Sequence, residues 1–108
     1  MKWKITYFCE DTQKLLLKWP KGLLAKYLRI LDLMADNGAN LGLPFTKAMG
    51  AGLFEIRVKA SEGIGRIFYC TVINKEIVIL HCFIKKTQKT PTKELNLAKQ
   101  RMLEVKNE

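Results

Sequence analysis

The sequence contains few of the residues that build metal sites and disulfide frameworks. It has one histidine, His81, and three cysteines, Cys9, Cys70 and Cys82, in 108 residues. The cysteine number is odd and no Cys-x-x-Cys spacing occurs, which argues against a disulfide framework and a zinc site. P-loop, dinucleotide-binding and nucleophilic-triad patterns are also missing. We therefore expect no metal and no cofactor, with Cys70 and Cys82 buried as small hydrophobic side chains in a reducing compartment.

Long hydrophobic runs are missing as well. No stretch reaches the ~18 apolar residues that a membrane-spanning helix needs. The first residues, MKWKITYFCED, lack the apolar segment of a signal peptide. The sequence therefore predicts a cytoplasmic protein that makes no membrane contact.

Acidic residues are scarce relative to basic ones. The chain has 19 Lys and Arg against 10 Asp and Glu, a net charge of +9, and the stretch Lys85 to Lys93 has no carboxylate. Such an excess favours contact with nucleic acid or another polyanion. A solvated, charged turn is the alternative interpretation of the lysine stretch.

The length and the 48% hydrophobic content predict one folded domain over residues 1–108. Alternation of apolar and polar residues predicts a strand over Lys2–Phe8. A short helix should follow and end at Pro20, and a second helix should cover about Lys21–Asp36. The glycine-rich stretch Asn37–Gly52 is expected to be a loop, either a plain connector or a functional segment.

Three closely spaced strands are predicted next, at Leu53–Lys59, Arg66–Ile73 and Glu76–Ile84, because turn residues separate them. A final helix should begin at Thr90 and Pro91. The predicted order is β-α-α-β-β-β-α. We expect an α+β fold in which a small antiparallel sheet packs its helices on one face and leaves part of the other face open.

Basic side chains should gather on that open face. If the apolar residues of Leu53–Lys59 face the helices, Arg57 and Lys59 point the other way. In a meander, Arg66 and the end of the last strand, Lys85 and Lys86, lie within a few strand spacings of them. An anion such as an RNA phosphate would relieve their mutual repulsion. The alternative is a solvated sheet edge with ordinary ion pairs to Glu55 or Glu62.

His81 is predicted to lie on the same face as Ile79, Phe83 and Lys85, because alternate residues of a strand share a face. General acid–base catalysis by this histidine is one interpretation. A hydrogen-bonded, partly buried structural histidine is the favoured one.

Three strings resemble the RelE/ParE toxin superfamily, and in particular its HigB-like, phage-derived branch. They are LFEIR, the Gly-Arg-x-x-Tyr pattern formed by Gly65, Arg66 and Tyr69, and LHCFIKKTQKTP. The resemblance covers most of the chain and is strongest from Leu53 to Arg101. It implies a RelE-like fold and the toxin of a type II toxin–antitoxin module.

Many members of that superfamily are metal-independent endoribonucleases (mRNA interferases) that cut messenger RNA on the ribosome and inhibit translation. The resemblance therefore implies mRNA, the ribosome and an antitoxin, expected to be a helix-turn-helix protein, as partners. In such cleavage the RNA 2′-hydroxyl attacks the adjacent phosphate, which requires a proton acceptor, cations for the phosphate and a proton donor.

The resemblance assigns the catalytic roles to Arg57, Arg66, Lys85 and Lys86. Arg66 and Lys86 would stabilise the phosphate and Arg57 would be a second clamp. Lys85 is a candidate base if its pKa falls, and Glu55 is another. Further RNA contacts are expected from four lysines: Lys47, Lys59, Lys89 and Lys93.

Some relatives place an aromatic residue or histidine near the C-terminus for proton transfer. This chain has no Tyr, His or Phe after Phe83. Two alternatives therefore stay open, a non-enzymatic toxin that binds DNA gyrase and a basic RNA-binding module that does not cleave.

Overall fold

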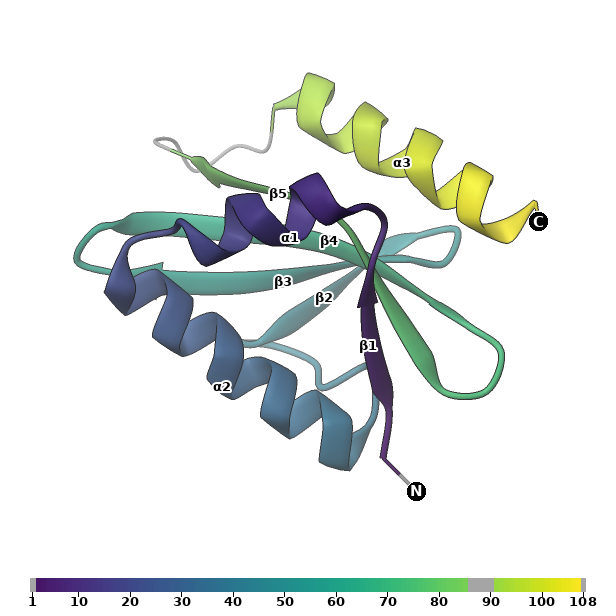
Figure 1. The fold of residues 1–108 in the computed structure, drawn as a ribbon, viewed down its shortest axis with the longest axis horizontal. Coiled ribbons are helices and arrows are strands. Elements are labelled where there is room, and N and C mark those ends of the chain that lie inside the picture. The colour runs from purple at the N-terminus through teal and green to yellow at the C-terminus, as the bar shows by residue number, and fades with distance from the viewer. Residues whose placement is uncertain (1, 86–90, 108) are drawn as a thin grey trace.

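The computed structural model describes residues 2–85 and 91–107. These residues form five strands and three helices (Figure 1): β1 Lys4–Tyr7, α1 Glu10–Leu17, α2 Lys21–Asn37, β2 Thr46–Gly50, β3 Leu53–Ala60, β4 Gly63–Val72, β5 Glu76–Lys85 and α3 Thr92–Lys106. The predicted α+β class and both early helices are confirmed. The final helix begins at Thr92, one residue after Pro91, while Thr90 lies outside the described residues.

The five strands form one sheet in the order β1-β5-β4-β3-β2. Strands β2 to β5 are antiparallel neighbours, as short connections require. The prediction of a purely antiparallel sheet was wrong at one edge, where β1 runs parallel to β5 with Lys4 opposite Glu76. Parallel neighbours need a long connection between them, and about 70 residues separate β1 from β5.

The stretch predicted to be a loop, Asn37–Gly52, contains the extra strand β2. This strand pairs with β3 from Thr46 opposite Ile56 to Gly50 opposite Leu53, across a bulge. Ala51 and Gly52 both have positive φ angles, 55° and 88°, which allow a tight reversal between the strands. Thus β2 is placed by its turn and its partner rather than by its own sequence pattern.

The helices cover both faces of the sheet, so the prediction that all of them pack on one face was wrong. Helices α1 and α2 bury Leu16, Leu23 and Tyr27 against Ile56 and Ile67 on the first face. Helix α3 crosses the other face, where its Ala98 and Met102 are buried against a second apolar cluster. We call these surfaces the α1/α2 face and the α3 face.

A bulge in β5 decides which side chains reach the α3 face. Phe68 lies opposite His81 and Tyr69 lies opposite Ile79, so Leu80 is an extra residue in β5. The carbonyl of Leu80 accepts a hydrogen bond of 2.7 Å from Arg101 Nη1 of α3. Because of the bulge, His81 and Ile79 lie on opposite faces, and the prediction that they share one was wrong.

The end of α2 and the turn between β4 and β5 lie where the sequence predicts them. Gly38, with φ of 105°, ends α2 directly after Asn37. Asn74 and Lys75 have φ angles of 65° and 56°, which makes the predicted tight turn between β4 and β5. None of the helices in the described part of the chain has the length and hydrophobicity needed to span a bilayer.

Candidate functional site

The part of the α3 face near the end of β5 gathers charged residues from three adjacent strands. The β3–β4 hairpin closes with Ala60 opposite Gly63, which places Arg57 opposite Arg66. Glu55, two residues before Arg57 on β3, then lies diagonal to Arg66 on the same face. On β5, the Leu80 bulge brings Lys85 to this face as well. We call Glu55, Arg66 and Lys85 the charged cluster.

The charged cluster is buried. Glu55 is 1% exposed, and Arg66 and Lys85 are each 5% exposed. Arg66 Nη1 donates a short hydrogen bond to Glu55 Oε1, and the two side chains form an ion pair. Among the described residues, Glu55 Oε2 and Arg66 Nε have no hydrogen-bond partner. Buried polar atoms without partners are costly, so this pair carries hydrogen-bonding capacity that the fold leaves unsatisfied.

Lys85 has a pKa below its ordinary value. Burial of the ammonium group is the largest cause, and the neighbouring positive charge of Arg66 adds to it, with a smaller contribution from Arg57. The carboxylate of Glu55 acts in the opposite direction. Lys85 was a candidate base only if its pKa is lowered. The structure meets that condition.

A hollow of about 440 Å³ lies beside the charged cluster. We call it the cluster hollow. Its cations are Arg57, Lys59 and Arg66, and its apolar walls include Pro44 and Ile64. Arg66 is buried, Arg57 is half-buried and Lys59 is exposed. The basic side chains of the cluster hollow are therefore more exposed to solvent the farther they lie from Glu55 along β3.

Aromatic rings border the cluster on β5. Phe83 lies opposite Arg66, and its ring centroid is 6.0 Å from that of His81. His81 Nε2 lies 3.3 Å from Glu94 Oε2 of α3. Burial lowers the pKa of His81, although Glu94 opposes the shift. The favoured prediction of a hydrogen-bonded, partly buried histidine is confirmed.

The structure brings together some of the predicted residues and separates others. Arg57, Lys59, Arg66 and Lys85 converge, but the expectation that Arg66 and Lys85 stand on an open basic face was wrong, because both are buried around Glu55. Lys47 is exposed on β2 directly opposite Glu55.

Lys93 is exposed in the first turn of α3, and the cluster hollow does not include it. Two more predicted residues, Lys86 and Lys89, lie outside the described residues. Within residues 2–85 and 91–107, no three His, Cys, Asp or Glu side chains are grouped as metal ligands would be.

The central position of Glu55 was the main feature that sequence reasoning missed. A usable signal was present in Ser61-Glu62, which forms the two-residue connection between the paired residues Ala60 and Gly63. Once that turn length is assumed, the pairing of Arg57 with Arg66 and the diagonal contact from Glu55 follow by counting.

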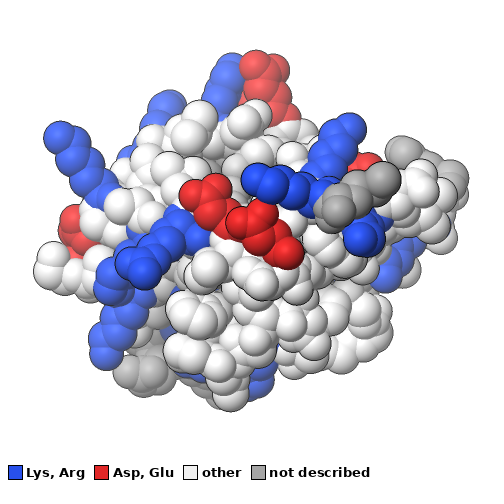
Figure 2. Space-filling view, turned by 90° about the horizontal axis from the view of Figure 1, so that it is seen from below, with Lys and Arg blue, Asp and Glu red and all other residues white. Residues whose placement is uncertain are grey.

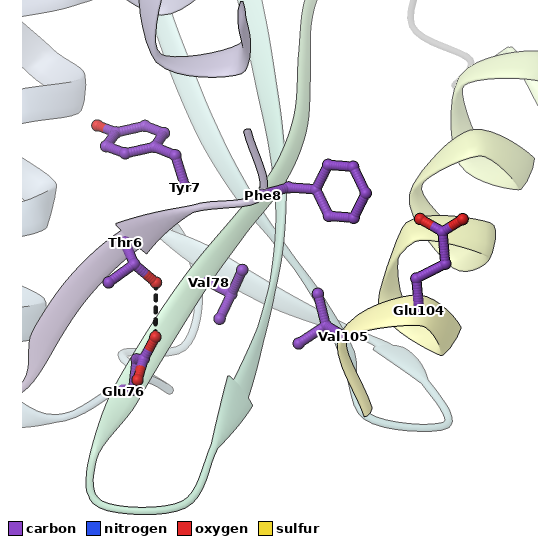
Figure 3. Close-up of a pocket in the computed structure, with 7 residues that line it drawn as sticks. All are labelled: Thr6, Tyr7, Phe8, Glu76, Val78, Glu104 and Val105. Carbon is purple, nitrogen blue, oxygen red and sulfur yellow. Dashed lines mark hydrogen bonds between the residues drawn. The ribbon is translucent and has the colours of Figure 1, made fainter. Parts of the chain in front are cut away.

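A second hollow, of about 610 Å³, lies between β1, β5 and the end of α3 (Figure 3). Thr6 Oγ1 donates a 2.8 Å hydrogen bond to Glu76 Oε2 on its wall, and Glu104 stands at its rim. Its lining contains carboxylates and no described cation. Its chemistry is therefore opposite to that of the cluster hollow.

Comparison with known families gives one match that covers most of the chain. The sequence model of the phage-derived Gp49-like proteins (DUF891) matches residues 14–103. The chain belongs to the phage-derived Gp49-like family. The match spans α2, every strand except β1 and most of α3, and so includes the charged cluster. No curated protein matches the sequence significantly.

Solved structures show that this Gp49-like chain has the RelE fold. A double arginine mutant of the Escherichia coli toxin RelE in the free state has a TM-score of 0.60 and 13% identity, covering 95% of this chain and 100% of that one. In the archaeal RelE–RelB complex of Pyrococcus horikoshii OT3, the matching chain has a TM-score of 0.52 and 17% identity, with coverage of 80% and 98%.

A chain of the toxin–antitoxin complex RelBE2 of Mycobacterium tuberculosis has a TM-score of 0.55 and 19% identity. It covers 81% of this chain and 95% of its own length. Together with the family match, these likenesses confirm the resemblance to the RelE superfamily and its phage-derived branch.

Proposed function

We propose that this Gp49-like protein is the toxin of a type II toxin–antitoxin module and an endoribonuclease that cuts messenger RNA on the ribosome without a metal. The observation that carries the proposal is the charged cluster, in which a lysine of lowered pKa and an arginine surround one buried carboxylate beside a cationic hollow. The RelE fold supports it, because one structure with this fold is the toxin RelE, a second is in a toxin–antitoxin complex and a third is in a RelE–RelB complex.

The reaction forms a bond from the RNA 2′-oxygen to the adjacent phosphorus and breaks the bond from phosphorus to the 5′-oxygen. Its products are a 2′,3′-cyclic phosphate and a 5′-hydroxyl. Lys85 in its neutral form takes the 2′-proton, since burial and Arg66 favour loss of its charge. Arg66 and Arg57 stabilise the charge that builds on the phosphate oxygens.

Glu55 positions Arg66 and is the second candidate for proton acceptor. Its ion pair fixes one edge of the guanidinium, and Arg66 also lines the cluster hollow, from which it would donate to a phosphate oxygen. Because no Tyr, His or Phe follows Phe83, the leaving 5′-oxygen takes its proton from solvent. Lys86, next along the chain, remains a proposed phosphate contact.

The proposed partners are messenger RNA, the ribosome and a helix-turn-helix antitoxin, and the proposed location is the cytoplasm, where ribosomes translate. Lys47 and Lys93 are exposed, and they are proposed to contact RNA outside the cluster hollow together with Lys89.

Mapping of RNA ends on translating ribosomes tests the proposal. The wild-type protein should produce new 5′-hydroxyl ends on a defined messenger, and none on the same RNA without ribosomes. Arg66→Lys should lower the rate about 100-fold or more, the loss typical of a disrupted transition-state donor. Lys85→Met should lower it by a similar factor, the loss typical of a removed general base. The matched control Lys99→Met changes an exposed lysine of α3 and should cleave normally.

Absence of cuts in every reaction would reject the nuclease proposal. Intact messenger together with DNA damage after expression would support gyrase binding instead. Salt-sensitive RNA binding without cuts would support a simple RNA-binding module.

A further inference from the structure

A second basic hollow adjoins the cluster hollow around the last residues of β3, which extend beyond its pairing with β2 and form the sheet edge there. It has a volume of about 450 Å³ and lies between α2, the segment Pro44–Phe45 and β3. We call it the α2 hollow. The two hollows share Arg57 and Lys59. The cations of the cluster hollow therefore continue over the sheet edge without interruption.

Two cations of α2 extend the row. Lys26 and Arg29 are exposed, lie three residues apart on one side of the helix and line the α2 hollow. Lys26 Nζ donates a hydrogen bond to the carbonyl of Lys59, which holds its positive charge at the edge of β3. Figure 2 views the molecule from below, the side where α2 lies, and shows Lys and Arg side chains toward the end where α2 begins and again at the opposite end, with acidic side chains between the two groups.

The floor of the α2 hollow is apolar. Ile30 and Leu33 of α2 and Val58 of β3 contribute to it, and Phe45 stands at its edge with 40% of its surface exposed. No Asp or Glu among the described residues lines either basic hollow. Cations around an apolar, partly aromatic floor suit single-stranded RNA, whose bases stack while its phosphates meet the charges.

We infer that the α2 hollow binds the nucleotides of single-stranded RNA that flank the phosphate held at the charged cluster. Phe45 stacks on a base, and Lys26 and Arg29 bind the neighbouring phosphates. This inference rests on the proposed function, because it takes the RNA at the charged cluster as its starting point. An acidic protein segment would use the same cations, and the binding test distinguishes it from RNA.

The test measures the affinity of fluorescent, 2′-O-methylated RNA, which binds without being cleaved. A trinucleotide and a dodecanucleotide of the same central sequence are titrated at several salt concentrations. The double variant Lys26→Ala, Arg29→Ala should weaken dodecanucleotide binding about tenfold and reduce the slope of log affinity against log salt by about 1.4, or about 0.7 for each lost phosphate contact. Trinucleotide binding should change less than about twofold.

The matched control is Lys18→Ala, Lys99→Ala, which removes the same charge from exposed helix-surface positions outside both basic hollows. It should leave the salt slope near that of the wild type. Phe45→Leu keeps an apolar side chain and removes the ring, and it should weaken dodecanucleotide binding at least about fivefold. Circular dichroism melting checks that each variant is folded.

Equal affinities for the test and control variants would overturn the inference. So would a loss of binding to an antitoxin protein with unchanged RNA binding, which would assign the α2 hollow to the protein partner. Cleavage on ribosomes is scored separately with the same variants. Binding that follows the expected pattern without any cleavage would reject the proposed nuclease and leave the RNA path standing.

Discussion

The α1/α2 face and the α3 face of the sheet differ in what they bury. On the α1/α2 face, side chains such as Leu23, Tyr27 and Ile67 form the larger, continuous apolar core. On the α3 face, a smaller apolar cluster ends at the buried charges of Glu55, Arg66 and Lys85. Since buried charges seldom stabilise a fold as well as apolar side chains of similar size, the α1/α2 face supplies the stability that lets the α3 face hold them.

Breaking the buried ion pair should have the largest effect. Arg66→Ala removes the ion-pair partner of the buried Glu55 carboxylate, and we expect a loss of about 3–5 kcal/mol in the free energy of unfolding. Urea denaturation measures it. The triple variant Glu55→Leu, Arg66→Leu, Lys85→Met removes all three charges of the cluster and should recover most of the loss. A triple variant as unstable as Arg66→Ala would show that the loss does not come from an unpaired buried charge.

Releasing the β5 bulge should have the next largest effect. Arg101→Met removes the donor to the Leu80 carbonyl, and leaving a buried acceptor without a partner costs about 1–3 kcal/mol. Arg101 also lies 4.9 Å from the centre of the Phe8 ring, so part of the loss will come from that contact.

Because the bulge determines the face on which Lys85 lies, cleavage by the folded Arg101→Met variant should also fall. The neighbouring change Lys99→Met is the control and should leave both stability and cleavage unaltered. Normal cleavage by Arg101→Met at temperatures where it is folded would show that the bulge persists without this hydrogen bond.

The pH dependence of Lys85 separates the charged cluster from the apolar core. Its pKa in the folded protein is lowered from 10.5, so between the lowered pKa and 10.5 the unfolded chain binds more protons than the folded one. Stability contributed by this group should therefore rise with pH across that window. Lys85→Met should flatten the rise in urea denaturation curves measured at alkaline pH.

The same group should control the rate of RNA cleavage. If neutral Lys85 is the base, the single-turnover rate should increase with pH until the lowered pKa is passed. In Glu55→Gln the carboxylate that raises the Lys85 pKa is gone, so a profile that keeps its shape and shifts to lower pH would support Lys85 over Glu55 as proton acceptor, and a profile lost in Glu55→Gln would reverse that assignment.

The smallest effect is expected for an ion pair at the surface. Lys14 Nζ lies 3.4 Å from Glu10 Oε1 on α1, and both side chains are largely exposed. Lys14→Gln should change the free energy of unfolding by less than about 0.5 kcal/mol, because water and salt screen the pair. A larger loss would mean that exposed pairs, and not only the buried one, contribute to the fold.

Much of the fold could be predicted because local patterns are consistent with it. The apolar periodicity of Lys21–Asp36 and the alternation in Leu53–Lys59 each correspond to an observed element. Strand β2 could not be predicted, because Thr46–Gly50 is short, mostly exposed and bulged. The position of β1 could not be predicted either, since its partner β5 lies about 70 residues away and no local signal encodes that pairing.

The candidate site could be predicted as a set of residues but not as an arrangement. Alternation on β3 correctly placed Arg57 on the face opposite the α1/α2 core. The burial of Arg66 and Lys85 depends on the ion pair to Glu55 and on the Leu80 bulge. A bulge of this kind shifts every later side chain by one position, and alternation in the sequence gives no sign of where it falls.

The parallel pairing of β1 with β5 also sets an order of events during synthesis. Tyr7 pairs with Ile79, so the first strand made has no partner until nearly three quarters of the chain has been produced. Contacts this distant in sequence close late, because a long loop must be ordered first. The nascent chain therefore completes its sheet only as its last strand emerges, at the same stage that delivers Lys85. Sheet closure and assembly of the charged cluster are thus one late step in the maturation of this protein.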